Sequence, residues 1–123
     1  MTRILIVDDS SFMRGSLKYI IERAGHEVTG MASDGSEALE MYKKLKPDVV
    51  TMDILMKGTD GMTALRNIME HDPNARVLII TALGTEQMKN EARRLRAKGY
   101  IRKPFSKAEI ISEINRVMAE ERP

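Results

Sequence analysis

The sequence has no cysteine, which excludes a disulfide framework, thiolate catalysis and a cysteine-ligated zinc or iron–sulfur site. It has only two histidines, so any metal site has to be built mainly from oxygen ligands. Oxygen ligands favour magnesium, calcium or manganese over softer metal ions. The composition therefore restricts metal chemistry to hard cations.

Long hydrophobic runs are also missing. Apolar residues come in runs of four or five, far short of the roughly 18 residues that cross a bilayer. The N-terminus does not continue into an apolar segment with a small-residue cleavage site, so no secretory signal is visible. We therefore expect a cytoplasmic protein without membrane insertion. At 123 residues, 42% hydrophobic and 31% charged, the chain predicts one domain, residues 1–123, around one core.

The chain alternates five times between a short apolar run and a longer amphipathic segment. The apolar runs suit strands that are covered on both faces, and they lie at residues 4–7, around 28, at 49–52, 77–80 and 100–101. The intervening segments have the three- or four-residue apolar spacing of helices, at 13–24, 38–45, 65–69, 88–95 and 110–118. This alternation predicts an α/β fold, a doubly wound sandwich with a parallel sheet and helices on both faces.

Polar residues at the expected helix starts support this interpretation. Two pairs have the spacing of capping boxes, Asp34 with Glu37 and Ser106 with Glu109. The remaining N-caps are expected at Ser10, Asp60 and Thr85.

Charged and polar residues follow the predicted strands at one edge of the sheet. Asp8 and Asp9 follow the first strand, Asp53 the third, Thr81 ends the fourth and Lys103 follows the fifth. In a flavodoxin-like sheet of order 2-1-3-4-5 the first and third strands are neighbours, so the three carboxylates converge where ligands bind. Like charges at such distances repel unless a cation lies among them. We expect Mg²⁺ there, with Mn²⁺ as a substitute.

Each of these residues has an ordinary structural role when it is considered singly, as an N-cap, a strand residue or a solvated tip. Together they suit the transfer of a phosphoryl group onto Asp53. A carboxylate is ionised at neutral pH and needs no base to attack phosphorus, while the cation and Lys103 stabilise the phosphoryl oxygens. Neither a GxxxxGK[ST] loop nor a GxGxxG fingerprint occurs, so we do not expect nucleotide binding.

Five segments together resemble the response-regulator receiver domain of two-component signalling, namely ILIVDDS, VTMDILM, TDGM, IITAL and YIRKPF. The chain is most similar to the stand-alone, CheY-like type of chemotaxis, and the likeness extends from Arg3 to about Ala119. The resemblance implies a regulatory phosphoacceptor rather than an enzyme that turns over external substrates. Autophosphorylation and autodephosphorylation are the only reactions it implies.

The resemblance also assigns roles around the acids. Asp53 matches the phosphoacceptor, and Asp8 and Asp9 match the acid pair that holds Mg²⁺. The backbone carbonyl of Leu55 matches the remaining protein ligand of the metal. Ala82 matches the small residue that leaves access for the phosphoryl group.

The remaining matches concern the switch. Thr81 and Lys103 match the hydroxyl and the amine that turn toward the phosphoryl group. Tyr100 matches the aromatic that moves inward when Thr81 shifts. Phosphorylation then biases a two-state equilibrium that changes the output face, formed by the fourth helix, fifth strand and fifth helix.

The charge pattern indicates how that face meets its partner. Residues 89–103 carry seven basic residues and one acid, a local charge of +6, although the whole chain has only +2. Lys89, Arg93 and Arg96 have the spacing of one helical stripe. An acidic target protein is therefore expected at this face, and a solvated face is the plain alternative. We do not expect nucleic acid, because only one aromatic lies nearby and no binding motif is present.

Other partners follow from the resemblance alone. The phosphodonor is expected to be a histidine kinase or a small molecule. A monomer and a phosphorylation-dependent dimer both stay open.

The chain departs from the usual family residue at two positions, and two further positions bear on hydrolysis of the phosphoryl group. Lys57 replaces the usual proline after Asp53, where a solvated lysine is the simpler expectation than a contact with the acids. Arg96 replaces the glycine that commonly ends the fourth helix. Leu55 and Leu83 lie at positions that influence hydrolysis of the phosphoryl group, and two apolar side chains there predict slow self-dephosphorylation.

Two alternative functions remain at this point. One is a constitutive adaptor that acts through the basic face without phosphorylation, which the complete set of site residues disfavours. The other is an aspartyl-phosphate phosphatase or phosphotransferase. Comparable enzymes need a second acid two residues after the nucleophile, where this chain has Leu55.

Overall fold

The computed structural model describes residues 1–120, so 121–123 of the predicted 1–123 domain lie outside the described residues. Strands and helices alternate along the chain in the order β1 (Arg3–Val7), α1 (Ser11–Arg23), β2 (Glu27–Ala32), α2 (Gly35–Leu45), β3 (Val49–Met52), α3 (Gly61–His71), β4 (Val77–Thr81), α4 (Glu86–Arg94), β5 (Gly99–Arg102) and α5 (Lys107–Ala119). The strands form one parallel sheet in the order β2-β1-β3-β4-β5, which confirms the predicted fold.

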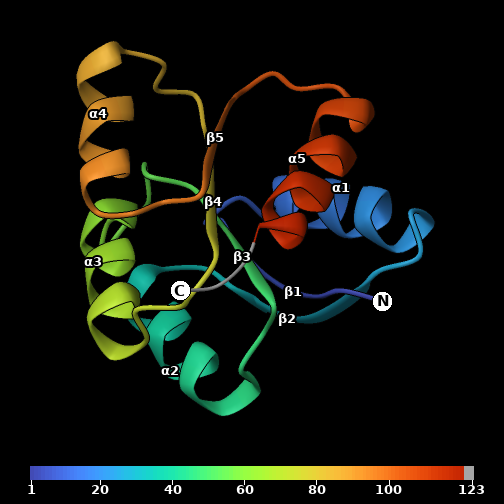
Figure 1. Ribbon diagram of the computed structural model, residues 1–123, viewed down its shortest axis with the longest axis horizontal. Coiled ribbons are helices and arrows are strands. Elements are labelled where there is room, and N and C mark those ends of the chain that lie inside the picture. The colour runs from blue at the N-terminus through green and yellow to red at the C-terminus, as the bar shows by residue number, and fades with distance from the viewer. Residues whose placement is uncertain (121–123) are drawn as a thin grey trace.

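The sheet separates two apolar cores, one on each face, so the prediction of a single core is wrong. Helices α1 and α5 cover one face, and α2, α3 and α4 cover the other (Figure 1). Along β1, Leu5 and Val7 pack under α2–α4, whereas Ile4 and Ile6 pack under α1 and α5. Because both faces of the strand are buried, its sequence is a continuous apolar run rather than an alternation. Within residues 1–120, none of the helices combines the length and apolarity that spanning a membrane requires.

All five predicted N-caps are confirmed, because each side chain accepts a hydrogen bond from the backbone N–H three residues later. The reciprocal capping box is present at α5, where Glu109 also accepts from the N–H of Ser106. At α2 the Glu37 carboxylate accepts instead from the N–H of Ser33, one residue before the Asp34 cap. The second capping box is therefore only half formed.

Helix α4 ends earlier than its basic stripe predicts. Its last residue is Arg94, and Arg96 lies beyond the end with a left-handed φ of 70°. The N–H groups of Arg96 and Ala97 bond back to the carbonyls of Arg93 and Ala92, each at 2.9 Å, which is a Schellman cap. The prediction that Arg96 continues the stripe of Lys89 and Arg93 is therefore wrong, because Arg96 is not helical.

We expect Arg96→Gly to raise the free energy of unfolding by about 0.5–1 kcal/mol, because glycine adopts the left-handed conformation without steric cost. Helix α1 already uses glycine in the same place, since Gly25 has a φ of 88°. Urea unfolding of Arg96→Gly and Arg96→Ala measures the effect. An equal gain from alanine, which removes the charge but keeps Cβ, would assign the cost to charge repulsion instead.

Candidate functional site

The acids converge because they continue the ladders of two neighbouring strands. Val7 of β1 is in register with Met52 of β3, so the next residues, Asp8 and Asp53, emerge side by side. The N–H of Asp53 donates to the carbonyl of Val7 at 3.0 Å. Farther along the same sheet, after strands β4 and β5, the N–H of Lys103 donates to the carbonyl of Thr81 at 2.8 Å. The site residues are therefore extensions of the sheet and take their positions from it.

The predicted acid cluster is present. Carboxylate oxygens of Asp8, Asp9 and Asp53 lie within 4.8 Å of one another. Asp8 and Asp53 are buried, and Asp9 is exposed. The ammonium of Lys103 contacts Asp8 Oδ2 at 2.8 Å and Asp53 Oδ2 at 3.1 Å. The three carboxylates and one ammonium leave a formal charge of −2 in a largely buried place.

Lys103 is held in its charged form by this arrangement. Burial alone would lower the pKa of its ammonium, because burial penalises the charged form. The hydrogen bonds and negative charges of Asp8 and Asp53 outweigh that penalty and raise the pKa of Lys103 above its ordinary value. The amine is therefore a cation at neutral pH, held between the two acids.

Main-chain N–H groups hold one oxygen of each acid. Asp8 Oδ1 accepts from Ser10 at 2.9 Å, and Asp53 Oδ1 accepts from Leu55 at 3.3 Å. Asp9 Oδ2 accepts from the N–H of Lys57 at 3.3 Å. The Lys57 side chain is exposed, so its contact with the acids is made by the backbone. The Leu55 side chain is also exposed.

Two further residues support the site without having been predicted. Gly61 packs on the backbone after β3, where an added Cβ would lie 2.0 Å from the carbonyl oxygen of Asp53. A glycine directly after the Asp60 cap is the signal for this close approach, because helix starts rarely need glycine there. The guanidinium of Arg14 donates to the carbonyl of Asp8 at 2.7 Å. No spacing rule pointed to Arg14.

The side chains of Thr81 and Tyr100 both bond to the backbone of Leu83, in the loop after β4. The hydroxyl oxygen of Thr81 is fully buried and accepts from the N–H of Leu83 at 3.4 Å. The Tyr100 hydroxyl donates to the carbonyl of the same Leu83. Burial, followed by the negative charge of Asp53, raises the pKa of Tyr100, so its hydroxyl remains protonated and keeps this donor. Ala82, between Thr81 and Leu83, is exposed.

Comparison with known proteins identifies this arrangement. The family model described as the response regulator receiver domain matches residues 4–115. The chemotaxis protein CheY of Thermotoga maritima is 49% identical over 94% of this chain and 96% of its own length. Protein CcdB of Bacillus subtilis is 45% identical over 96% of this chain and 98% of its own.

A solved structure agrees with these sequence matches. A chain in the crystal structure of the CheX–CheY–BeF3–Mg²⁺ complex from Borrelia burgdorferi superposes on this protein with a TM-score of 0.94 and is 40% identical to it in sequence. The match covers 97% of this chain and 90% of that chain. The chain belongs to the response regulator receiver domain family. It is a CheY-like receiver domain, and receiver domains generally serve as regulatory phosphoacceptors in two-component signalling.

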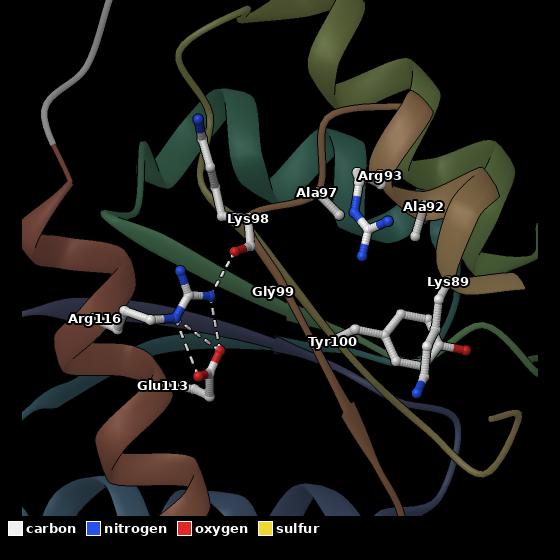
Figure 2. Close-up of a pocket in the computed structure, with 9 residues that line it drawn as sticks. All are labelled: Lys89, Ala92, Arg93, Ala97, Lys98, Gly99, Tyr100, Glu113 and Arg116. Carbon is white, nitrogen blue, oxygen red and sulfur yellow. Dashed lines mark hydrogen bonds and ion pairs between the residues drawn. The ribbon is translucent and has the colours of Figure 1, made fainter. Parts of the chain in front are cut away.

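The receiver domain has a polar cavity of about 340 Å³ at the predicted output face, between α4, β5 and α5. Lys89, Arg93 and the ring of Tyr100 border it from one side (Figure 2). On the opposite side Arg116 bonds Glu113 at 2.8 Å and the carbonyl of Lys98 at 2.7 Å (Figure 2). Tyr100, the predicted switch residue, and two residues of the basic stripe therefore line the same cavity.

Part of the basic charge is compensated within the domain. Lys89 lies 3.9 Å from Glu86, and Arg94 lies 3.3 Å from Glu91. The seven basic residues of 89–103 outnumber Glu86 and Glu91, so the face keeps a net positive charge despite these pairs.

The acid cluster fits a hard divalent cation. Its donors are carboxylate oxygens, which are the ligands that Mg²⁺ prefers, and they come from two adjacent strand ends held by the sheet. A charge of +2 would cancel the formal −2 of the cluster with Lys103. The donor chemistry and the charge therefore both agree with the predicted metal.

Proposed function

We propose that residues 1–123 form one receiver domain that takes a phosphoryl group onto Asp53 in a Mg²⁺-dependent reaction. The observation that carries this proposal is the contact of Lys103 with both Asp8 and Asp53 in a cluster of three carboxylates. Asp8, Asp9, Asp53 and the Leu55 carbonyl would hold the cation. When bound, Mg²⁺ neutralises charge on the phosphoryl oxygens during transfer.

The transfer itself needs little from the protein besides position and charge. A carboxylate oxygen of Asp53 attacks phosphorus, forming an oxygen–phosphorus bond, while the donor keeps the electron pair of the bond that breaks. With acetyl phosphate the leaving group is acetate, and with a histidine kinase it is the imidazole of the partner. Lys103 then pairs with an oxygen of the phosphoryl group, and exposed Ala82 leaves room for the donor to approach.

The phosphorylated site would act on the loop after β4. Negative charge on Asp53 draws Thr81 toward it, which breaks the bond between Thr81 and the Leu83 N–H. Since Tyr100 holds the carbonyl of Leu83, movement of this loop changes the position of the Tyr100 ring. Tyr100 lines the cavity between α4 and α5, so the output face changes with it.

The output partner we propose is a separate protein with an acidic binding segment. Lys89 and Arg93 border the cavity next to Tyr100, while Arg96 lies just beyond the end of α4. A carboxylate-rich segment complements these charges and would sense the Tyr100 position. Binding should weaken as salt concentration rises.

Intact-mass spectrometry after incubation with acetyl phosphate and Mg²⁺ tests the proposed function. The wild type should gain the mass of one phosphoryl group, and neither Asp53→Ala nor an EDTA-treated wild type should gain it. Lys43→Ala, an exposed lysine change on α2, serves as a matched control. Phosphorylation of Asp53→Ala, or equal phosphorylation in EDTA, would contradict the proposal. Salt-sensitive partner binding unaffected by Asp53→Asn would favour a constitutive adaptor.

We expect slow self-dephosphorylation, mainly because of Leu55. Its side chain is 55% exposed at the site, whereas Leu83 is half-buried and packs against the core under α2–α4. A polar group at position 55 would orient an attacking water, and Leu55→Asn should therefore shorten the phosphorylated lifetime about tenfold. Decay of the phosphorylated mass with time measures it, with Leu83→Asn as the comparison. An unchanged lifetime in Leu55→Asn would refute this explanation.

A further inference from the structure

The three acids of the cluster are not held by equal numbers of hydrogen-bond donors. Asp8 and Asp53 both accept from Lys103, and each has a backbone N–H on its other oxygen. Asp9 differs, because within residues 1–120 the N–H of Lys57 is the one donor that the structure gives its carboxylate. It is also the exposed member of the three. The orientation of Asp9 therefore has the fewest restraints.

The segment that carries Lys57 is fixed at several points. Gly58 turns the chain with a left-handed φ of 78°, and the carbonyl of Thr59 accepts from Gly35 at 3.1 Å. Asp60 caps α3, and the N–H of Gly61 donates to the carbonyl of Ile54 at 3.0 Å. These bonds tie the loop after β3 to both neighbouring helices. A donor on this loop is thus a fixed point for a carboxylate of the loop after β1.

We infer that the main-chain N–H of Lys57 is a positioning group for Asp9. It holds the Oδ2 atom of Asp9 at 3.3 Å and so restrains a carboxylate that has an oxygen within 4.8 Å of those of Asp8 and Asp53, before a cation binds. Pre-orientation removes part of the entropy cost of binding, so the affinity for Mg²⁺ rises. This inference rests on the proposed function, because it concerns the same cation site.

The side chain of Lys57 should act in the opposite direction. It is an exposed cation on the loop beside the acids, and a positive charge there disfavours a second cation. A test of the backbone donor therefore has to remove the side-chain charge in both variants. Lys57→Gln removes the charge and keeps the N–H, whereas Lys57→Pro removes both.

Isothermal titration of the full chain with MgCl₂ measures the two variants. We expect Lys57→Pro to bind Mg²⁺ about threefold more weakly than Lys57→Gln, because only part of the free energy of this hydrogen bond goes into ordering the carboxylate for the cation. The same pair in an Asp9→Ala background should show no difference, because the acceptor is then missing. Thermal unfolding of each variant establishes that the proteins compared are folded.

Two results would overturn the inference while leaving the proposed function intact. One is an equal dissociation constant for Lys57→Gln and Lys57→Pro. The other is a difference of the same size in the Asp9→Ala background, which would assign it to a general change in the loop. Absence of Mg²⁺ binding by the wild type would instead overturn the proposed function together with this inference.

Discussion

Replacing Gly61 by alanine is expected to lower the free energy of unfolding by about 3 kcal/mol. The new Cβ would lie 2.0 Å from the carbonyl oxygen of Asp53 and 2.6 Å from Cα of Ile54. Both obstacles are backbone atoms, so no side-chain rotation relieves the clash. The start of α3 has to move away from β3, and Asp53 moves with the strand end. Urea unfolding and phosphorylation by acetyl phosphate should both detect the change.

Gly15 provides the matched control for this substitution. A Cβ at Gly15 meets nothing within 4 Å, and the residue lies inside α1. Gly15→Ala should therefore stabilise the protein by about 0.5–1 kcal/mol, because alanine is the better helix former. Similar free energies of unfolding for Gly61→Ala and the wild type would show that the backbone at Asp53 leaves room for a side chain at residue 61, which would contradict this prediction.

Replacing Lys103 by methionine is expected to destabilise the protein by about 3 kcal/mol at neutral pH in the presence of a chelator. The change keeps an unbranched side chain, one heavy atom shorter, and removes the cation between Asp8 and Asp53, which are 2% and 6% exposed. Two buried carboxylates then lack a counter-charge. Denaturant unfolding measures the loss, and Lys43→Met, on the exposed surface of α2, should change stability little.

The pH and metal dependence of Lys103→Met follow from the same contacts. The pKa of Lys103 is raised in the folded protein, so its contribution is complete at neutral pH and disappears as pH rises through that elevated value. The stability difference from the wild type should therefore shrink above about pH 10.5. Mg²⁺ should stabilise Lys103→Met more than the wild type, because the ion then supplies the missing positive charge. Equal stabilisation by Mg²⁺ would contradict this explanation.

Periodicity predicted the helices and four of the strands well, because their apolar residues are buried in regular patterns. Strand β2 was predicted only around Val28 because it is an edge strand, and several of its residues are partly exposed. The helical stripe failed at Arg96 because the end of a helix depends on backbone dihedrals. The spacing alone therefore missed the left-handed conformation of Arg96, although the residue replaces the glycine that commonly ends this helix in the family.

The acid cluster was predictable because of a general rule about parallel sheets. Residues that follow neighbouring strands share one edge, so Asp8 after β1 and Asp53 after β3 had to lie close together. Lys103 follows β5, two strands away from β3, and its long side chain brings the ammonium to both acids. The measured contacts of the Lys103 ammonium, 2.8 Å to Asp8 and 3.1 Å to Asp53, show how close these groups lie. By contrast, the N–H of Lys57 at Asp9 depends on the path of the loop after β3, which no periodicity describes. Every residue except proline carries a backbone N–H, so the residue type does not reveal which of these donors will bond to a carboxylate.

The central claim is that carboxylates from two strands share one divalent cation beside the phosphoacceptor. A crystal soaked in MnCl₂ tests this claim most directly, because Mn²⁺ substitutes for Mg²⁺ and can be located by its anomalous scattering. We predict one manganese ion in contact with the carboxylates of Asp8, Asp9 and Asp53. Full occupancy of manganese elsewhere, with none between these acids, would contradict the account.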